Sequence, residues 1–251
     1  MRMTRDELRE LLLSTGLEML AEEGLAGGAD RLTFKRVFDR VEDETGVRVT
    51  NASVIRRIWT DNEDYQHDVL RRAISDHSAD GLEAAIRRGD RVVKRADLSS
   101  AAGRRAAVSE LCRVAGGALA QALSESQSWH LVMGALGNMA SQPDDHRDDR
   151  ITDAARAAYS ELTRRVGDAM AGLTRQIGLR PKAGLNVQQF ALAVVALSAG
   201  CAVGDRVDPD GVRKIRLPSG PGGRRQEWHL LSVGLEALVW QFMELEPGSR
   251  R

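Results

Sequence analysis

The sequence predicts an all-α protein. Ala, Leu, Arg and Glu dominate at helical spacing, and alternation of β-branched residues never persists over the length of a strand. The 251 residues are 42% hydrophobic and 29% charged, which is typical of a folded globular protein rather than a disordered one. This length allows one large domain or two modest ones, and the order of the expected helices favours two.

The first two helices are marked by their capping residues. A helix is expected from about Thr4 to Gly24, because Thr4 and Glu7 have the spacing of a capping box and glycine commonly ends a helix. The segment 25–32 contains two glycines and no periodicity, which predicts a loop. Thr33 is then expected to cap a second helix. The buried face of that second helix is expected to contain Phe34, Val37, Phe38 and Val41.

A compact basic segment follows the second helix. From Thr45 to Thr60 the chain has three arginines and no acidic residue, a local charge of +3 in a chain of zero formal net charge. Gly46 predicts a turn, and a short third helix ending at Trp59 would turn apolar side chains inward and polar ones outward. Arginine and asparagine read base edges and hydroxyls hold phosphates. The residues expected to contact DNA are Thr33, Lys35, Arg48, Thr50, Asn51, Ser53, Arg56 and Arg57.

Residues 4–75 resemble the DNA-binding domain of the tetracycline repressor (TetR) family of bacterial transcriptional regulators. The first helix of that family ends in Glu-x-Gly, matched by Glu22-Glu23-Gly24, and its second helix opens on a threonine, matched by Thr33. Its third helix ends in an aromatic residue before a polar turn and an acidic helix start, matched by Trp59-Thr60-Asp61-Asn62-Glu63.

This chain also departs from the family pattern. The span from Thr33 to Trp59 is several residues longer than is usual, Arg56 replaces a phosphate-binding tyrosine and Asn62 replaces a lysine. The resemblance implies a helix-turn-helix DNA-binding domain at residues 1–75. It also implies a helical domain at residues 76–251 that forms a homodimer and binds a small effector.

The remaining helices follow from apolar periodicity. A long helix is expected to begin near Asp61 and to extend to about Arg88. Further helices are expected at about 99–123, 126–140, 146–178, 186–204 and 224–244. The segment 204–225 is rich in glycine and proline and is expected to be a loop.

The last two helices are expected to dimerise. Apolar residues lie on two opposite faces of the helix 224–244, so one face can enter the core and the other can meet a second copy. The alternative is that both helices are central helices of a monomer. The expected interface residues are Phe190, Val194, Leu197, Leu231, Leu235, Leu238 and Phe242.

An effector pocket is expected on the middle helices of the second domain. Few aromatic residues occur in the chain, so a pocket would be lined mostly by aliphatic and Met side chains and would favour an apolar ligand. The expected ligand-binding residues are Trp129, Met133, Met139 and Met170. Ordinary core packing of these residues is the alternative.

Other classes of site have little support. No catalytic motif occurs, and the acidic cluster from Asp144 to Asp149 is explained by the dipole of the following helix, so we expect no enzyme activity, metal or cofactor. Cys112 and Cys201 lie in apolar contexts and predict buried thiols in a reducing compartment. The N-terminus lacks a signal-peptide core, and the apolar run 190–203 is shorter than the roughly 20 residues of a membrane span, which predicts a cytoplasmic protein without membrane contact.

The sequence therefore predicts a homodimeric regulator that binds a two-fold symmetric site on double-stranded operator DNA. We expect it to act as a repressor that a small apolar ligand releases. Two other classes remain as alternatives: a helical protein-interaction scaffold, and a small helical enzyme without DNA binding.

Overall fold

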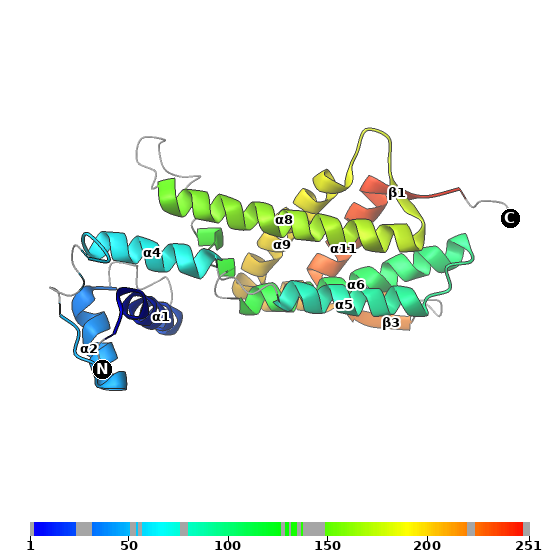
Figure 1. Ribbon diagram of the computed structural model, residues 1–251. Coiled ribbons are helices and arrows are strands. Elements are labelled where there is room, and N and C mark those ends of the chain that lie inside the picture. Colours follow the sequence, from blue (N-terminus) through cyan, green and yellow to red (C-terminus); the bar gives the residue numbers. More distant parts are fainter. Residues whose placement is uncertain are drawn as a thin grey trace. The chain divides into compact units, whose positions relative to one another are not determined.

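The computed structural model describes residues 3–23, 32–50, 54, 57–75, 80–126, 129–130, 132–134, 137, 149–219 and 224–247. Within these residues the chain is mostly helical, with short strands in two antiparallel pairs (Figure 1). The all-α expectation is confirmed at this level. The contacts divide the chain into two compact units, residues 1–77 with 127–158, and residues 78–126 with 159–251.

The first unit contains α1 (Arg5–Glu23), α2 (Phe34–Thr45) and α4 (Asn62–Ser75), and α1 packs against both of the others. The predicted capping box of α1 is confirmed, because Thr4 N donates to Glu7 Oε2 at 2.7 Å and Glu7 N donates to Thr4 Oγ1 at 3.2 Å. The expected start of α2 is confirmed as well, with Thr33 as its N-cap and the four predicted apolar residues buried.

The second unit is built around α6 (Ala101–Glu125). This helix packs against α5 (Asp80–Arg95), α9 (Val187–Val207) and α11 (Leu230–Phe242), and the short α10 (Pro209–Arg213) packs against α9 and α11. The long helix α8 (Asp149–Ile177) belongs to both units. Its residues up to Ala158 group with the first unit, and the rest group with the second. In place of the single helix expected over 61–88, the structure has α4 and α5 as separate helices.

Residues 208–228 correct two expectations. The predicted loop contains α10 and the strand β2 (Ile215–Ser219), and the start of the helix expected at 224 is the strand β3 (Arg224–Trp228). The two strands pair in antiparallel register from Ile215 opposite Trp228 to Ser219 opposite Arg224. Trp228 is buried and holds one end of this hairpin on the unit, a tertiary contact that periodicity in five-residue segments does not reveal.

A second strand pair joins the connection after α8 to the end of α11. The strand β1 (Leu179–Pro181) pairs with β4 (Met243–Leu245), and Gly178, at φ 75°, makes the turn that precedes it. Lys182 strengthens this junction, because its backbone N donates to Phe242 O at 2.9 Å and its Nζ donates to Trp240 O at 2.6 Å. Three-residue strands of this kind carry no periodic signal in the sequence.

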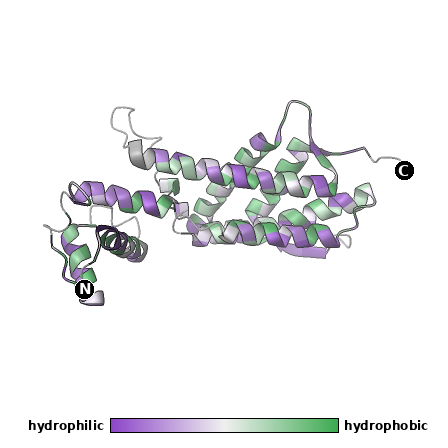
Figure 2. Cartoon of the chain, viewed as in Figure 1, coloured by the Kyte–Doolittle hydropathy of each residue, from purple (hydrophilic) through white to green (hydrophobic). Residues whose placement is uncertain are grey.

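Helix α9 (Val187–Val207) agrees with the helix expected at about 186–204 and extends three residues further. Its 21 residues make it, among the described helices, the one long and apolar enough to cross a membrane by length and composition. A core helix satisfies the same two criteria. Figure 2 shows α9 and α11 as mostly hydrophobic, and one face of α9 is buried against α6, α10 and α11. Cys201 on α9 and Cys112 on α6 are buried free thiols, as predicted.

Candidate nucleic-acid interface

Four aromatic rings form the centre of the first unit. Phe34 stacks on Phe38 with ring centroids 5.6 Å apart and contacts Tyr65 at 5.4 Å. Trp59 meets Tyr65 edge to face at 4.8 Å. Because these rings come from α2, from α4 and from the segment that precedes α4, the cluster fixes the three parts relative to one another.

Tyr65 also joins this cluster to α1. Its hydroxyl donates to the backbone oxygen of Leu12 at 2.8 Å, and its side chain is completely buried. Burial raises the pKa of the Tyr65 phenol well above its ordinary value, so the hydroxyl remains a hydrogen-bond donor.

The first turn of α4 holds the beginning of α2. Asn62 Oδ1 accepts from Phe34 N at 2.7 Å, and Asn62 Nδ2 donates to Leu32 O at 3.1 Å. Gln66 Nε2 donates to the same oxygen at 3.1 Å, while Thr33 Oγ1 accepts from Arg36 N at 3.4 Å. Asn62 therefore stabilises the fold of this unit, at the position where the TetR family that residues 4–75 resemble has a lysine.

Asp68 of α4 connects three parts of the same unit. Its carboxylate forms ion pairs with Arg9 of α1 and Arg71 of α4, and it accepts a hydrogen bond from Trp59 Nε1 at 3.1 Å. Partial burial by itself raises the pKa of Asp68, but the bonds from Arg71, Trp59 and Arg9 outweigh burial and hold the pKa below its usual value. Asp68 is therefore ionised near neutral pH and anchors Trp59.

The chain turns sharply after α2. Gly46 adopts the left-handed conformation at φ 70° and its N–H bonds to Glu42 O at 2.9 Å, the geometry of a glycine C-cap. The chain from Val47 to Thr50 has no regular structure, and Val54 is helical. Val49, Val54 and Trp59 are all buried. These apolar anchors fix which side of the segment faces the core.

The polar residues of the same segment lie on its outer side. Arg48, Thr50 and Arg57 are exposed, as is Lys35 in the first turn of α2. Within the described part of the chain, Lys35, Arg48 and Arg57 form no ion pair with a carboxylate. Of the other predicted DNA contacts, Thr33 is half-buried as the cap of α2, and Asn51, Ser53 and Arg56 lie outside the described residues.

The charge on α2 itself is divided. Lys35 and Arg36 occupy its first turn, whereas Asp39, Glu42, Asp43 and Glu44 are exposed further along. A polyanion is repelled by the second half of α2. The basic approach to this unit therefore runs from the N-terminus of α2 to the segment 48–57.

The predicted effector residues do not form one described pocket. Trp129 is buried and Met133 half-buried in the stretch 127–158, which groups with the first unit, whereas Met170 is half-buried on the part of α8 in the second unit. Met139 lies outside the described residues. None of the three described residues lines the groove described next.

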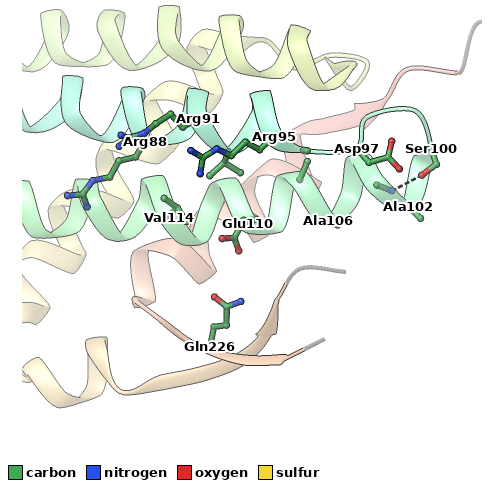
Figure 3. Close-up of a pocket in the computed structure, with 14 residues that line it drawn as sticks. Arg88, Arg91, Arg95, Asp97, Ser100, Ala102, Ala106, Glu110, Val114 and Gln226 are labelled. Atoms are coloured by element: carbon green, nitrogen blue, oxygen red, sulfur yellow. Dashed lines mark hydrogen bonds between the residues drawn. The ribbon is translucent and has the colours of Figure 1, made fainter. Parts of the chain in front are cut away.

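Sequence reasoning missed a groove on the second unit. It lies between α5, α6 and β3, and three arginines of α5 line it, namely Arg88, Arg91 and Arg95 (Figure 3). The signal was present, because spacings of three and four residues place these arginines on one helix face. Arginine is so abundant in this chain that the pattern does not stand out from composition.

The predicted dimer residues lie on the inner side of their helices. Phe190, Val194, Leu231 and Leu235 are at most 5% exposed in a single chain, so they pack in its core and are not available to a partner. Leu197, Leu238 and Phe242 are half-buried. The large apolar residues of α9 that remain exposed are Leu192, Val203 and Val207, at 50%, 57% and 80%. Both faces of α9 are apolar, and periodicity alone cannot tell which one meets α6.

Comparison with known proteins identified no relative of this chain. The chain matches no protein-family model, and searches of curated proteins and of solved structures found no similar protein.

Proposed function

We propose that the chain is a transcriptional regulator that binds double-stranded DNA with the segment from Arg48 to Arg57. The observation that carries this proposal is the two-sided anchoring of the segment. Val49, Val54 and Trp59 are buried, while Arg48, Thr50 and Arg57 are exposed next to the glycine turn. A rigid scaffold that presents unpaired arginines after a helix and a tight turn is what a helix-turn-helix reader requires.

The N-terminus of α2 supplies a second contact to the DNA backbone. The positive end of the helix dipole favours a phosphate, and exposed Lys35 adds a full charge. The carboxylates in the second half of α2 restrict the DNA to this end of the helix. The remaining predicted contacts, Asn51, Ser53 and Arg56, would read base edges from the same segment.

The regulator acts as a homodimer in this proposal, so that two copies of the segment meet two half-sites. The support for a dimer is the exposed apolar stripe on α9 formed by Leu192, Val203 and Val207. A repressor of this kind is released when a ligand binds better to its DNA-incompetent state. The resemblance of the first 75 residues implies a small effector for this step, and the low aromatic content of the chain favours an apolar one.

Selection from a random duplex library, followed by fluorescence-polarisation titration at several salt concentrations, tests DNA binding. The full chain is expected to enrich a two-fold symmetric sequence. The double variant Arg48→Ala/Arg57→Ala is expected to weaken binding by about tenfold or more and to flatten the salt dependence, since each arginine acts in both half-sites.

Arg105→Ala provides the matched control, because Arg105 is an exposed arginine on α6 of the second unit. Its affinity for the selected duplex should equal that of the wild type. No enriched sequence, or equal losses in the control and in the double variant, would show that the segment is not a DNA reader.

A further inference from the structure

An open groove of about 1130 Å³ lies on the second unit. Helix α5 forms one side, α6 the floor, and Gln226 extends from β3 on the other side, as Figure 3 shows. The volume slightly exceeds the roughly 300–1,000 Å³ that is typical of small-molecule sites. The groove is therefore large enough for a ligand of appreciable size.

Three arginines give the groove its charge. Arg88, Arg91 and Arg95 follow one another along α5 and are all exposed. None of them has an ion pair with any carboxylate that the structure describes. Two acidic residues also line the groove, but each is engaged elsewhere. Glu110 forms a two-pronged salt bridge with Arg113, and Asp97 accepts hydrogen bonds from Ser99 N and Oγ at 3.0 and 2.6 Å.

The structure of α5 does not require these arginines. The other basic residues of the same stretch are paired at helical spacing, Arg87 with Glu83 and Lys94 with Asp90. Arg95 in the last turn is favoured by the helix dipole, but Arg88 and Arg91 lie further back and repel each other and Arg95 at these spacings. An unpaired row of like charges costs stability, which indicates a binding role.

The floor of the groove is apolar apart from Glu110. Ala102, Ala106 and Val114 come from α6, Val92 comes from α5 beside the arginines, and Ala96 directly follows α5. Small aliphatic side chains leave room and offer no hydrogen-bond partners to a polar ligand. A bound molecule would therefore place a hydrophobic body on α6 and an anionic group against α5.

We propose that this groove binds a small amphipathic organic anion, with an alkyl or aryl body on α6 and a carboxylate or phosphate held by Arg88, Arg91 and Arg95. This inference goes beyond DNA binding, because it concerns residues of the second unit alone. It also differs from the apolar or amphipathic ligand that the sequence predicted at Trp129, Met133, Met139 and Met170, because it adds an anionic group and lies at other residues. A nucleic acid strand fits the groove less well, since its charged backbone gains nothing from the aliphatic floor.

Isothermal titration of the full chain with octanoate and with octyl phosphate tests the proposal without any DNA. At least one of the two is expected to bind, and comparison of the two assigns the head group as carboxylate or phosphate. Inorganic phosphate, octanol and octylammonium should each bind at least about tenfold more weakly, because each lacks the body, the charge or the correct sign.

Two variants locate the site. Arg88→Gln/Arg91→Gln should weaken binding by about tenfold or more, whereas Arg87→Gln, on the same helix but paired with Glu83, should leave it unchanged. Ala106→Leu should also weaken binding by filling the floor. Circular dichroism confirms that each variant remains folded.

Several results would overturn the inference. The first is that neither octyl anion binds. The second is that inorganic phosphate or octylammonium binds as tightly as the octyl anions. The third is that Arg87→Gln weakens binding as much as Arg88→Gln/Arg91→Gln does. A fourth is a single-stranded oligonucleotide whose binding depends on Arg88 and Arg91 and that displaces the octyl anion, which would assign the groove to nucleic acid. DNA binding through Arg48 and Arg57 is measured separately, so either proposal can fail alone.

Discussion

Asp68 shows how one side chain can determine the position of a binding segment. Its carboxylate ties α1 to α4 and accepts from Trp59 Nε1, so the end of the basic segment is held by a charge-assisted hydrogen bond as well as by ring packing. Nothing in the sequence distinguishes Asp68 from the other exposed-looking acids of the chain. Its partners Arg9 and Trp59 lie 59 and 9 residues away.

Asp68→Asn is expected to lower the stability of the first unit by about 1–2 kcal/mol at pH 7, because the charged acceptor of Arg9, Arg71 and Trp59 is lost. The folded pKa of Asp68 is depressed, so its contribution is fully present above the unfolded pKa of about 3.9 and is lost as pH falls through the folded value. The cost of the variant should therefore disappear in strong acid.

Urea unfolding of wild type and variant at pH 7 and at progressively lower pH measures this difference. Glu18→Gln is the control, because Glu18 is exposed on α1 and forms no ion pair with any residue that the structure describes. A difference between wild type and Asp68→Asn that stays constant down to the most acidic condition would exclude the proposed ion pairs.

A second buried carboxylate organises the second unit. Asp205 of α9 pairs with Arg213 of α10 at 2.8 Å and lies 3.2 Å from His229 Nε2. His229 Nδ1 accepts from Leu231 N and so caps α11, which leaves the ring proton on Nε2 to donate to Asp205. This network holds α10 and α11 against α9. Because α10 directly precedes β2 and α11 directly follows β3, the network also fixes the positions of both ends of the β2–β3 hairpin.

At the scale of helices, close approach depends on glycine in particular places. A methyl group at Gly16 of α1 would overlap the Tyr65 hydroxyl and lie 2.9 Å from Val69 Cγ2, both on α4. By contrast, a methyl group at Gly172 of α8 would meet nothing within 4 Å. The same residue type therefore has a packing role in one helix and none in the other.

Gly16→Ala is expected to destabilise the chain by about 1–3 kcal/mol, because α1 and α4 must separate or Tyr65 must lose its bond to Leu12. Gly172→Ala should stabilise it by about 0.5–1 kcal/mol through the lower entropy of the unfolded chain. Chemical denaturation of both variants gives the comparison, and the same sign for the two changes would be incompatible with the packing of α1 on α4.

At the scale of the whole molecule, the unpartnered face of α9 is the feature that needs explanation. Leu192, Val203 and Val207 remain exposed while the opposite face of the same helix is buried. Contiguous apolar surface on a folded chain is typical of an interface. Leu235, which we expected at that interface, is a core residue, so a charge there would unfold the chain rather than separate two copies.

Val203→Glu is expected to convert a dimer into a folded monomer, because it places a charge in the interface without disturbing the core. Sedimentation velocity at micromolar concentration measures the state of association, and circular dichroism measures the fold. Arg105→Glu on α6 should remain dimeric. A monomeric wild type, or a Val203→Glu protein that still dimerises, would remove α9 from the interface.

The sequence by itself determined the elements whose signals are local. Capping residues at Thr4 and Thr33, and apolar periodicity over α1, α2, α6 and α8, fix helices because a helix bonds within its own segment. The inward-facing Val54 and Trp59 and the basic character of the segment around them were also predictable from pattern alone, whereas the burial of Val49 was not.

Only the tertiary structure decided which surfaces remain free. Strands β1 and β4 exist because distant segments pair, as Arg180 does with Glu244, and a sequence window contains only one partner of each pair. The exposed face of α9 and the arginine row of α5 depend in the same way on which neighbours cover or pair each residue. Burial and pairing are properties of the folded chain. Periodicity shows which helix faces are apolar or charged, and packing determines which of those faces are covered.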